Sequence, residues 1–134
     1  MKKINRGYTF VEILVVITII ALIAGISAVS YVATNKNARD ARRMSDIETI
    51  RSALELFRSE TGFYPDLSVD ANNCISSTEI VDTSISPSVN YIKIIPKDPK
   101  DPDKCYTYTR TTETTYSMTY YSEKDSEVKT VTNP

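Results

Sequence analysis

The hydrophobic pattern divides the chain near residue 31. From Tyr8 to Tyr31 the sequence holds one charged residue, Glu12, and no proline. As a helix, these 24 residues would extend about 36 Å, enough to cross the hydrocarbon core of a bilayer. Three basic residues precede the run: Lys2, Lys3 and Arg6. We therefore expect a membrane-spanning helix with its basic flank in the cytoplasm and the rest of the chain outside.

Beyond this run the pattern changes to a single apolar face. Apolar residues recur at steps of three or four, at Ala41, Met44, Ile47, Ile50, Leu54 and Phe57. Charged residues occupy the other faces, at Arg39, Arg43, Asp46, Arg51, Glu55 and Arg58. With no proline before Pro65, the pattern predicts one helix from about Tyr8 to about Glu60, with Gly62 just beyond its end. Ile47, Ile50, Leu54 and Phe57 are predicted to face a sheet formed by the rest of the chain.

The remaining sequence has the pattern of a loop followed by short strands. Residues 66–90 are polar and turn-rich, and we expect a long loop there with a short turn of helix at 76–82. Alternating and Tyr/Thr-rich segments predict strands at 91–95, 105–110 and 115–121, and a fourth strand or a tail at 127–131. Three prolines between residues 96 and 102 exclude regular structure there. The predicted fold is α+β: a long N-terminal helix, apolar then amphipathic, packed on a small antiparallel sheet.

Composition narrows the range of functions. The 134 residues include 16 basic and 17 acidic ones, no histidine and two cysteines. No Ser-His or Cys-His catalytic pair is available, so we expect a structural protein rather than an enzyme. The charge balance gives no indication of nucleic-acid binding. Cys74 and Cys105 form an even pair in the segment expected outside the cytoplasm, which favours a disulfide; the alternative is two free thiols.

A carboxylate inside an apolar run is costly, which indicates that Glu12 has a partner. Gly7 ends the basic leader, the aromatic Tyr8 follows it, and Glu12 is the fifth residue from Tyr8. This stretch resembles the type III signal of type IV prepilins and pseudopilins. The resemblance implies cleavage after Gly7, N-methylation of Tyr8, and a role for Glu12 in assembly. A plain membrane anchor or an ordinary secretory signal, cut near residues 28–30, are the alternatives.

The segment 41–65 and the stretch 95–99, which precedes a Tyr-rich strand, also resemble the major pseudopilin of type II secretion and many major pilins. The resemblance implies a leader at 1–7, a transmembrane and filament-core segment at 8–31, and an extracytoplasmic pilin-like domain at 32–134. Expected partners are prepilin peptidase, further copies of the chain in a helical homopolymer, and an inner-membrane assembly platform with its ATPase. The subunit would first lie in the cytoplasmic membrane and then in a pilus or a secretion pseudopilus. A membrane-anchored binding module outside the cell is the alternative from another class.

Calcium is the one cofactor for which the sequence offers candidate ligands. The resemblance implies a calcium loop near the C-terminus, which pseudopilins usually carry, and here Glu123 and Asp125 are the candidates for its ligands. A solvated polar turn is the simpler interpretation of these residues. We therefore expect no cofactor, with calcium as the alternative. Asp101 and Asp103 are a second pair of acids that could suggest acid/base chemistry. The prolines beside them favour a plain loop instead.

Overall fold

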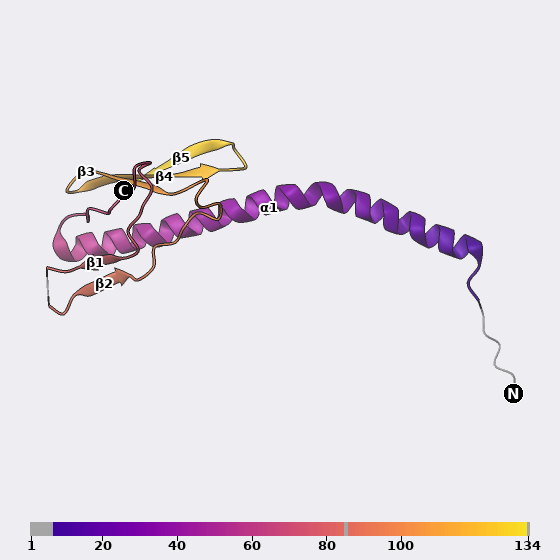
Figure 1. Ribbon diagram of the computed structural model, residues 1–134, viewed down its shortest axis with the longest axis horizontal. Coiled ribbons are helices and arrows are strands. Elements are labelled where there is room, and N and C mark those ends of the chain that lie inside the picture. The colour runs from indigo at the N-terminus through magenta and orange to yellow at the C-terminus, as the bar shows by residue number, and fades with distance from the viewer. Residues whose placement is uncertain (1–6, 85, 134) are drawn as a thin grey trace, which may run out of the picture. The chain divides into compact units, whose positions relative to one another are not determined.

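The computed structural model describes residues 7–84 and 86–133, with the backbone alone at 27–30. The basic residues of the leader therefore lie outside the described residues. The described chain forms one long helix and five strands (Figure 1): α1 (Phe10–Thr61), β1 (Ile80–Asp82), β2 (Val89–Ile92), β3 (Thr107–Thr112), β4 (Thr115–Ser122) and β5 (Glu127–Thr132). It divides into two compact units, residues 1–35 and residues 36–134. The predicted α+β class is confirmed, and each unit is described separately below.

The first unit consists of the N-terminal part of α1. Every side chain from Phe10 to Ile26 is exposed, although most of these residues are large and apolar. By length and composition, α1 is the one helix among the described residues that is long and apolar enough to cross a membrane. An exposed apolar surface of this extent is unfavourable in water, so this segment requires lipid or other helices around it.

In the second unit, α1 ends as the sequence predicts. Gly62 adopts a left-handed conformation with φ of +86°, and its N–H donates to the carbonyl oxygen of Arg58 at 2.8 Å. This hydrogen bond satisfies a carbonyl group at the helix end, and a glycine accepts that conformation without steric cost. The chain then turns away from the helix and forms the two sheets.

The strands form two antiparallel sheets rather than one. β1 pairs with β2, and β3, β4 and β5 follow one another as a meander. Short turns near residues 112 and 124 join the three strands of the meander, which correspond to the strands predicted at 105–110, 115–121 and 127–131. The helical turn predicted at 76–82 is wrong, because Ile80–Asp82 is a strand with both end residues buried. The predicted strand 91–95 also begins earlier, at Val89, and ends at Ile92.

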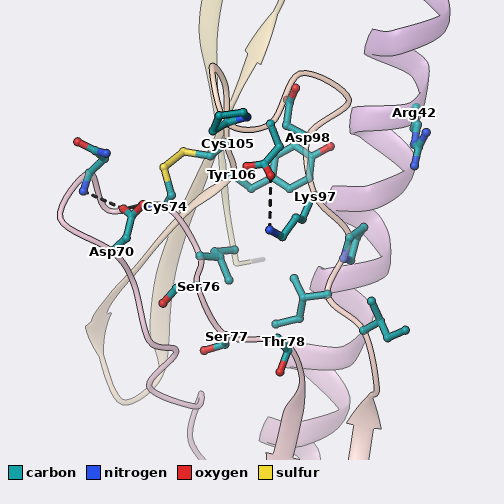
Figure 2. Close-up of a pocket in the computed structure, with 17 residues that line it drawn as sticks. Arg42, Asp70, Cys74, Ser76, Ser77, Thr78, Lys97, Asp98, Cys105 and Tyr106 are labelled. Atoms are coloured by element: carbon teal, nitrogen blue, oxygen red, sulfur yellow. Dashed lines mark hydrogen bonds and ion pairs between the residues drawn. A yellow bond between two sulfur atoms is a disulfide. The ribbon is translucent and has the colours of Figure 1, made fainter.

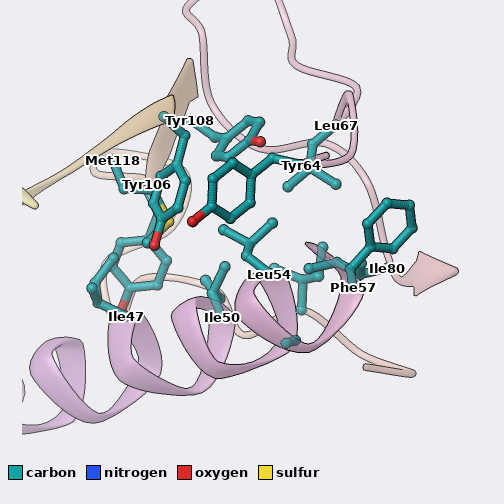
Figure 3. Close-up of a cluster of buried hydrophobic side chains, with 13 residues drawn as sticks. Ile47, Ile50, Leu54, Phe57, Tyr64, Leu67, Ile80, Tyr106, Tyr108 and Met118 are labelled. Atoms are coloured by element: carbon teal, nitrogen blue, oxygen red, sulfur yellow. The ribbon is translucent and has the colours of Figure 1, made fainter. Parts of the chain in front are cut away.

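One hydrophobic core holds α1 against both sheets (Figure 3). The four helix residues predicted to face inward are all buried, with exposed fractions of 5% or less. They pack with Ala53 and with residues from the loops and strands: Tyr64, Leu67, Ile80, Ile95, Tyr106, Tyr108, Tyr116 and Met118. Aromatic rings interlock within this core, and the Phe57 ring lies edge-on to Tyr91 with centroids 5.2 Å apart. The tyrosine-rich strands therefore supply core packing.

The helix face differs from the predicted one at its N-terminal end. Ala41 and Met44 were placed on the apolar face, but both are exposed. Arg43, placed on a polar face, is instead fully buried. The reason lies outside the helix: carboxylates from α1, the 93–106 loop and the β4–β5 turn surround its guanidinium.

Candidate functional site

The first candidate site is the N-terminal end of α1, where Gly7 and Tyr8 precede the helix. Neither residue belongs to a helix or strand, and the Tyr8 side chain is 82% exposed. No atom outside the chain neighbours lies within 4 Å of the position that a Cβ on Gly7 would occupy. Among the described residues, none packs against the Gly7–Tyr8 peptide bond, which lies before the first helical residue, Phe10.

Glu12 lies in the first turn of α1 and caps it together with Thr9. The N–H and the hydroxyl of Thr9 donate to Glu12 Oε2 at 3.3 and 3.5 Å, and the N–H of Glu12 donates to the Thr9 hydroxyl at 3.2 Å. This reciprocal arrangement is a capping box, which satisfies helix N–H groups that have no partner in the helix. It also places a negative charge at the positive end of the helix dipole. The spacing of Thr9 and Glu12, three residues apart at the start of an apolar run, is the sequence signal for this cap.

A second cluster, buried in the second unit, centres on Arg43. Its guanidinium donates two hydrogen bonds to Asp98, at 2.7 and 3.0 Å, one to Asp40 at 2.7 Å and one to Glu123 at 2.8 Å. The side chains of Arg43 and Asp98 are both completely shielded from solvent. We call Asp40, Arg43, Asp98 and Glu123 the ionic cluster. It ties the 93–106 loop and the β4–β5 turn to α1.

The ionic cluster also fixes the turn that contains both calcium candidates. Asp40 accepts the N–H groups of Glu123 and Lys124 at 3.0 and 2.8 Å. The Glu123 carboxylate accepts from Arg39 and Arg43 and forms an ion pair with Lys100 at 3.2 Å. Asp125 forms an ion pair with Lys129 at 3.1 Å. The structure therefore places basic side chains of the chain itself around both candidate carboxylates.

The same contacts lower the pKa of two acids. The pKa of Glu123 lies well below its usual range, chiefly because Arg39 donates hydrogen bonds to it, with further contributions from Arg43 and Lys100 that outweigh its burial. Burial alone would raise the pKa of Asp40, but the N–H groups of Glu123 and Lys124, together with Arg43, bring it below its usual value. Both acids therefore remain ionised under mildly acidic conditions.

A third feature is a cavity beside the disulfide (Figure 2). Cys74 and Cys105 form a disulfide with their Cα atoms 5.6 Å apart, and both residues line the cavity. The cavity has a volume of about 590 Å³ and a mixed lining, with hydroxyls at 76–78 and apolar groups at 94–96. At its edge Lys97 lies 3.4 Å from Asp101, one of the two loop acids. Its size falls within the range of small-molecule sites.

A metal site needs several ligating side chains grouped in space. Among the residues that the structure describes, no group of three or more Asp, Glu, Cys or His side chains is placed to hold a metal ion. The buried acids are engaged with arginines and backbone N–H groups within the fold. The ionic cluster was not predicted, because Asp98 and Glu123 lie 55 and 80 residues from Arg43 in the sequence and share no pattern with it.

Comparison with known proteins gives one match. The family model of the prokaryotic N-terminal methylation motif matches residues 2–28. No curated protein and no solved structure matches the chain. The match covers the Gly7–Tyr8 bond, the capped start of α1 and most of the exposed apolar segment, and it points to a structural subunit rather than an enzyme. The chain therefore carries at its N-terminus the prepilin-type signal of type IV pilins and pseudopilins.

Proposed function

We propose that this protein is a structural subunit of a type IV pilus-like filament, a pilin or a major pseudopilin. One observation carries the proposal: the matched signal, residues 2–28, contains an apolar helical segment in which every residue from Phe10 to Ile26 is exposed. In the membrane, lipid would cover this surface. In a filament, the same segments of neighbouring copies would cover it, stabilised by apolar burial.

In this proposal the chain is processed before it assembles. Prepilin peptidase cleaves the exposed bond after Gly7, and the new N-terminal residue, Tyr8, is methylated. An assembly platform in the inner membrane and its ATPase then add the subunit to the base of the filament. The globular unit, residues 36–134, lies outside the cytoplasm throughout.

Glu12 is proposed to recognise the amine of the neighbouring subunit as the two chains join. Its described hydrogen bonds with Thr9 all use Oε2 or the backbone N–H. A carboxylate offers about four acceptor positions, so the cap leaves room for an ammonium ligand. An unpaired carboxylate in the apolar core would penalise every other axial offset between subunits. The competing explanation is that Glu12 serves only to cap its own helix.

Two substitutions separate these explanations. Glu12→Gln keeps an oxygen that accepts the Thr9 N–H, so it retains the cap and removes only the charge. Glu12→Ala removes both. If the intersubunit ion pair is essential, both variants are cleaved normally and neither yields filaments; if the cap alone matters, Glu12→Gln assembles like the wild type. Cleavage and sheared filament yield are measured separately for each variant.

The matched control is Glu48→Gln, which removes the same charge from an exposed position in the second unit. It should leave both cleavage and filament yield unchanged. Normal filament yield from Glu12→Gln alone would refute the intersubunit role. A loss of filaments in the control would show that the assay responds to net charge.

A second candidate function is that of a membrane-anchored binding module, which the cavity of about 590 Å³ beside the disulfide favours. In that case the chain would remain in the membrane as single subunits and retain residues 1–7. Electron microscopy of cells that express the chain with a prepilin peptidase distinguishes the two functions. Filaments that contain the chain support the first, and their absence supports the second.

The choice between a pilus and a secretion pseudopilus is best tested in the gene neighbourhood. A secretin and cargo-secretion genes beside this one would assign it to type II secretion. A retraction ATPase would assign it to a pilus used for adhesion, motility or DNA uptake.

A further inference from the structure

A basic recess lies on the second unit where the helix enters it. It is lined by Lys36, Lys100, Lys104, Tyr121, Glu123 and Ser126 and has a volume of about 270 Å³. Its residues come from α1, the loop before β3, strand β4 and the β4–β5 turn. Three ammonium groups and one carboxylate thus line one small open space.

The carboxylate does not cancel the charge of the recess. Glu123 is engaged with Arg39 at 2.6 Å and Arg43 at 2.8 Å, two cations that are not part of the lining, and with Lys100 at 3.2 Å. The Lys104 ammonium lies 4.0 Å from the centroid of the Tyr121 ring, a cation–π contact that leaves its charge in place. Lys36 is exposed to solvent. The recess therefore presents positive charge toward solvent.

The position of Lys36 in the sequence relates the recess to the membrane. Lys36 follows Tyr31, the end of the apolar run, by five residues within α1. Five helical residues extend about 8 Å, and the headgroup layer on each side of a bilayer adds roughly 5–8 Å to the hydrocarbon core. When residues 8–31 span the hydrocarbon, Lys36 lies at the level of the lipid headgroups.

We propose that this recess binds the phosphate of an anionic phospholipid headgroup while the subunit is in the membrane. Clustered lysines next to a membrane helix attract anionic lipids, and tyrosine is favoured at the membrane–water interface. The bound headgroup holds the globular unit on the membrane surface until the subunit leaves the bilayer. The inference rests on membrane insertion of the helix and does not depend on filament formation.

The test uses the full cleaved chain in phosphatidylcholine nanodiscs that contain a minor fraction of phosphatidylglycerol. Native mass spectrometry of the extracted subunit gives the ratio of the two lipids that remain bound. The test variant, Lys36→Gln with Lys104→Gln, leaves Lys100 in place to support Glu123. The control, Lys93→Gln with Lys97→Gln, removes two exposed lysines outside the recess.

We expect the wild type and the control to retain phosphatidylglycerol in preference to phosphatidylcholine. A lysine near an anionic surface contributes about fivefold to binding. In the test variant, which lacks two lysines, the ratio of retained phosphatidylglycerol to phosphatidylcholine should therefore be roughly 25-fold lower. Equal retention of both lipids by the wild type would overturn the proposal. An equal loss in both variants would also overturn it, because bulk charge would then explain the effect.

A second measurement needs no substitution. Solid-state NMR dephasing between lysine ¹⁵Nζ and lipid ³¹P in wild-type proteoliposomes should detect a lysine in direct contact with phosphate. The absence of dephasing would contradict the proposal. This test uses the wild type, so it holds even where a variant fails to fold. If the test variant retained phosphatidylglycerol as well as the wild type does, the lipid assignment would be wrong.

Discussion

Replacement of Arg43 by methionine should severely destabilise the globular unit. Methionine replaces the apolar stem of arginine but carries no guanidinium and no charge, so the substitution leaves a buried carboxylate uncompensated. Asp98 loses both of its bonds to the guanidinium, and the N–H of Lys100 is the donor that remains to its side chain among the described contacts. Its side chain is fully shielded, so water cannot replace the lost partner without disrupting the fold.

The expected magnitude follows from this geometry. Removal of one partner from a buried ion pair costs about 3–5 kcal/mol. For a domain of this size, each kcal/mol shifts the melting temperature by about 4–8 °C, so we expect a decrease of ~12 °C or more. Since the whole folding free energy of such domains is about 5–15 kcal/mol, the variant would lose a large share of its stability.

The assay is thermal unfolding of a fragment that begins at Thr34. Unfolding is monitored by the near-ultraviolet circular dichroism of the buried tyrosines. The fragment should fold alone, because the core and the ionic cluster lie within residues 36–134. The matched control is Arg42→Met, whose side chain is 68% exposed and lies 4.0 Å from Asp46. It should change stability by less than about 0.5 kcal/mol.

A rescue variant tests the cause as well as the size of the effect. In the Arg43→Met background, Asp98→Asn removes the uncompensated charge and keeps an oxygen to accept the Lys100 N–H. It should therefore recover part of the lost stability. If Arg43→Met melted within a few degrees of the Arg42→Met control, or if Asp98→Asn made it worse, the account of the ionic cluster would be refuted.

Three further predictions concern the same fragment. Phe57→Ala should lower its stability by about 3–5 kcal/mol, since the ring is buried among aromatic neighbours; an unchanged melting temperature would show that the helix face is misassigned. Reduction of the Cys74–Cys105 disulfide, which closes a separation of 31 residues, should cost roughly 3–4 kcal/mol in the chain-entropy model, measured by denaturation with and without reductant. The pKa of Glu123 is lowered on folding, so its contribution is complete above about pH 5 and lost as the pH falls through the folded value; Arg39→Met should move acid unfolding to higher pH, and an unchanged acid midpoint would contradict this.

The sequence predicts the local parts of this fold well. The apolar run, the three- and four-residue spacing, and Gly62 define α1 to within two residues at each end. The meander follows from alternation in Tyr/Thr-rich segments between polar turns. These features depend on residues close together in the chain, where backbone periodicity decides the structure.

The remaining features depend on distant contacts. Ile80–Asp82 is too short for its period to be recognised, and pairing with β2 makes it a strand rather than a turn of helix. Arg43 has the sequence pattern of a surface residue, and only the approach of Asp98 and Glu123 from distant loops makes its burial favourable. At the N-terminus, the spacing of Gly7, Tyr8 and Glu12 was recognisable from the sequence alone.

The central claim is that the chain is cut after Gly7 and assembles through its N-terminal helix. The most direct measurement is the intact mass of the protein in filaments sheared from cells that express it with a prepilin peptidase. The account predicts a chain that begins at Tyr8 and carries one added methyl group. Assembled protein that retains residues 1–7, or sheared filaments that lack this chain, would contradict it.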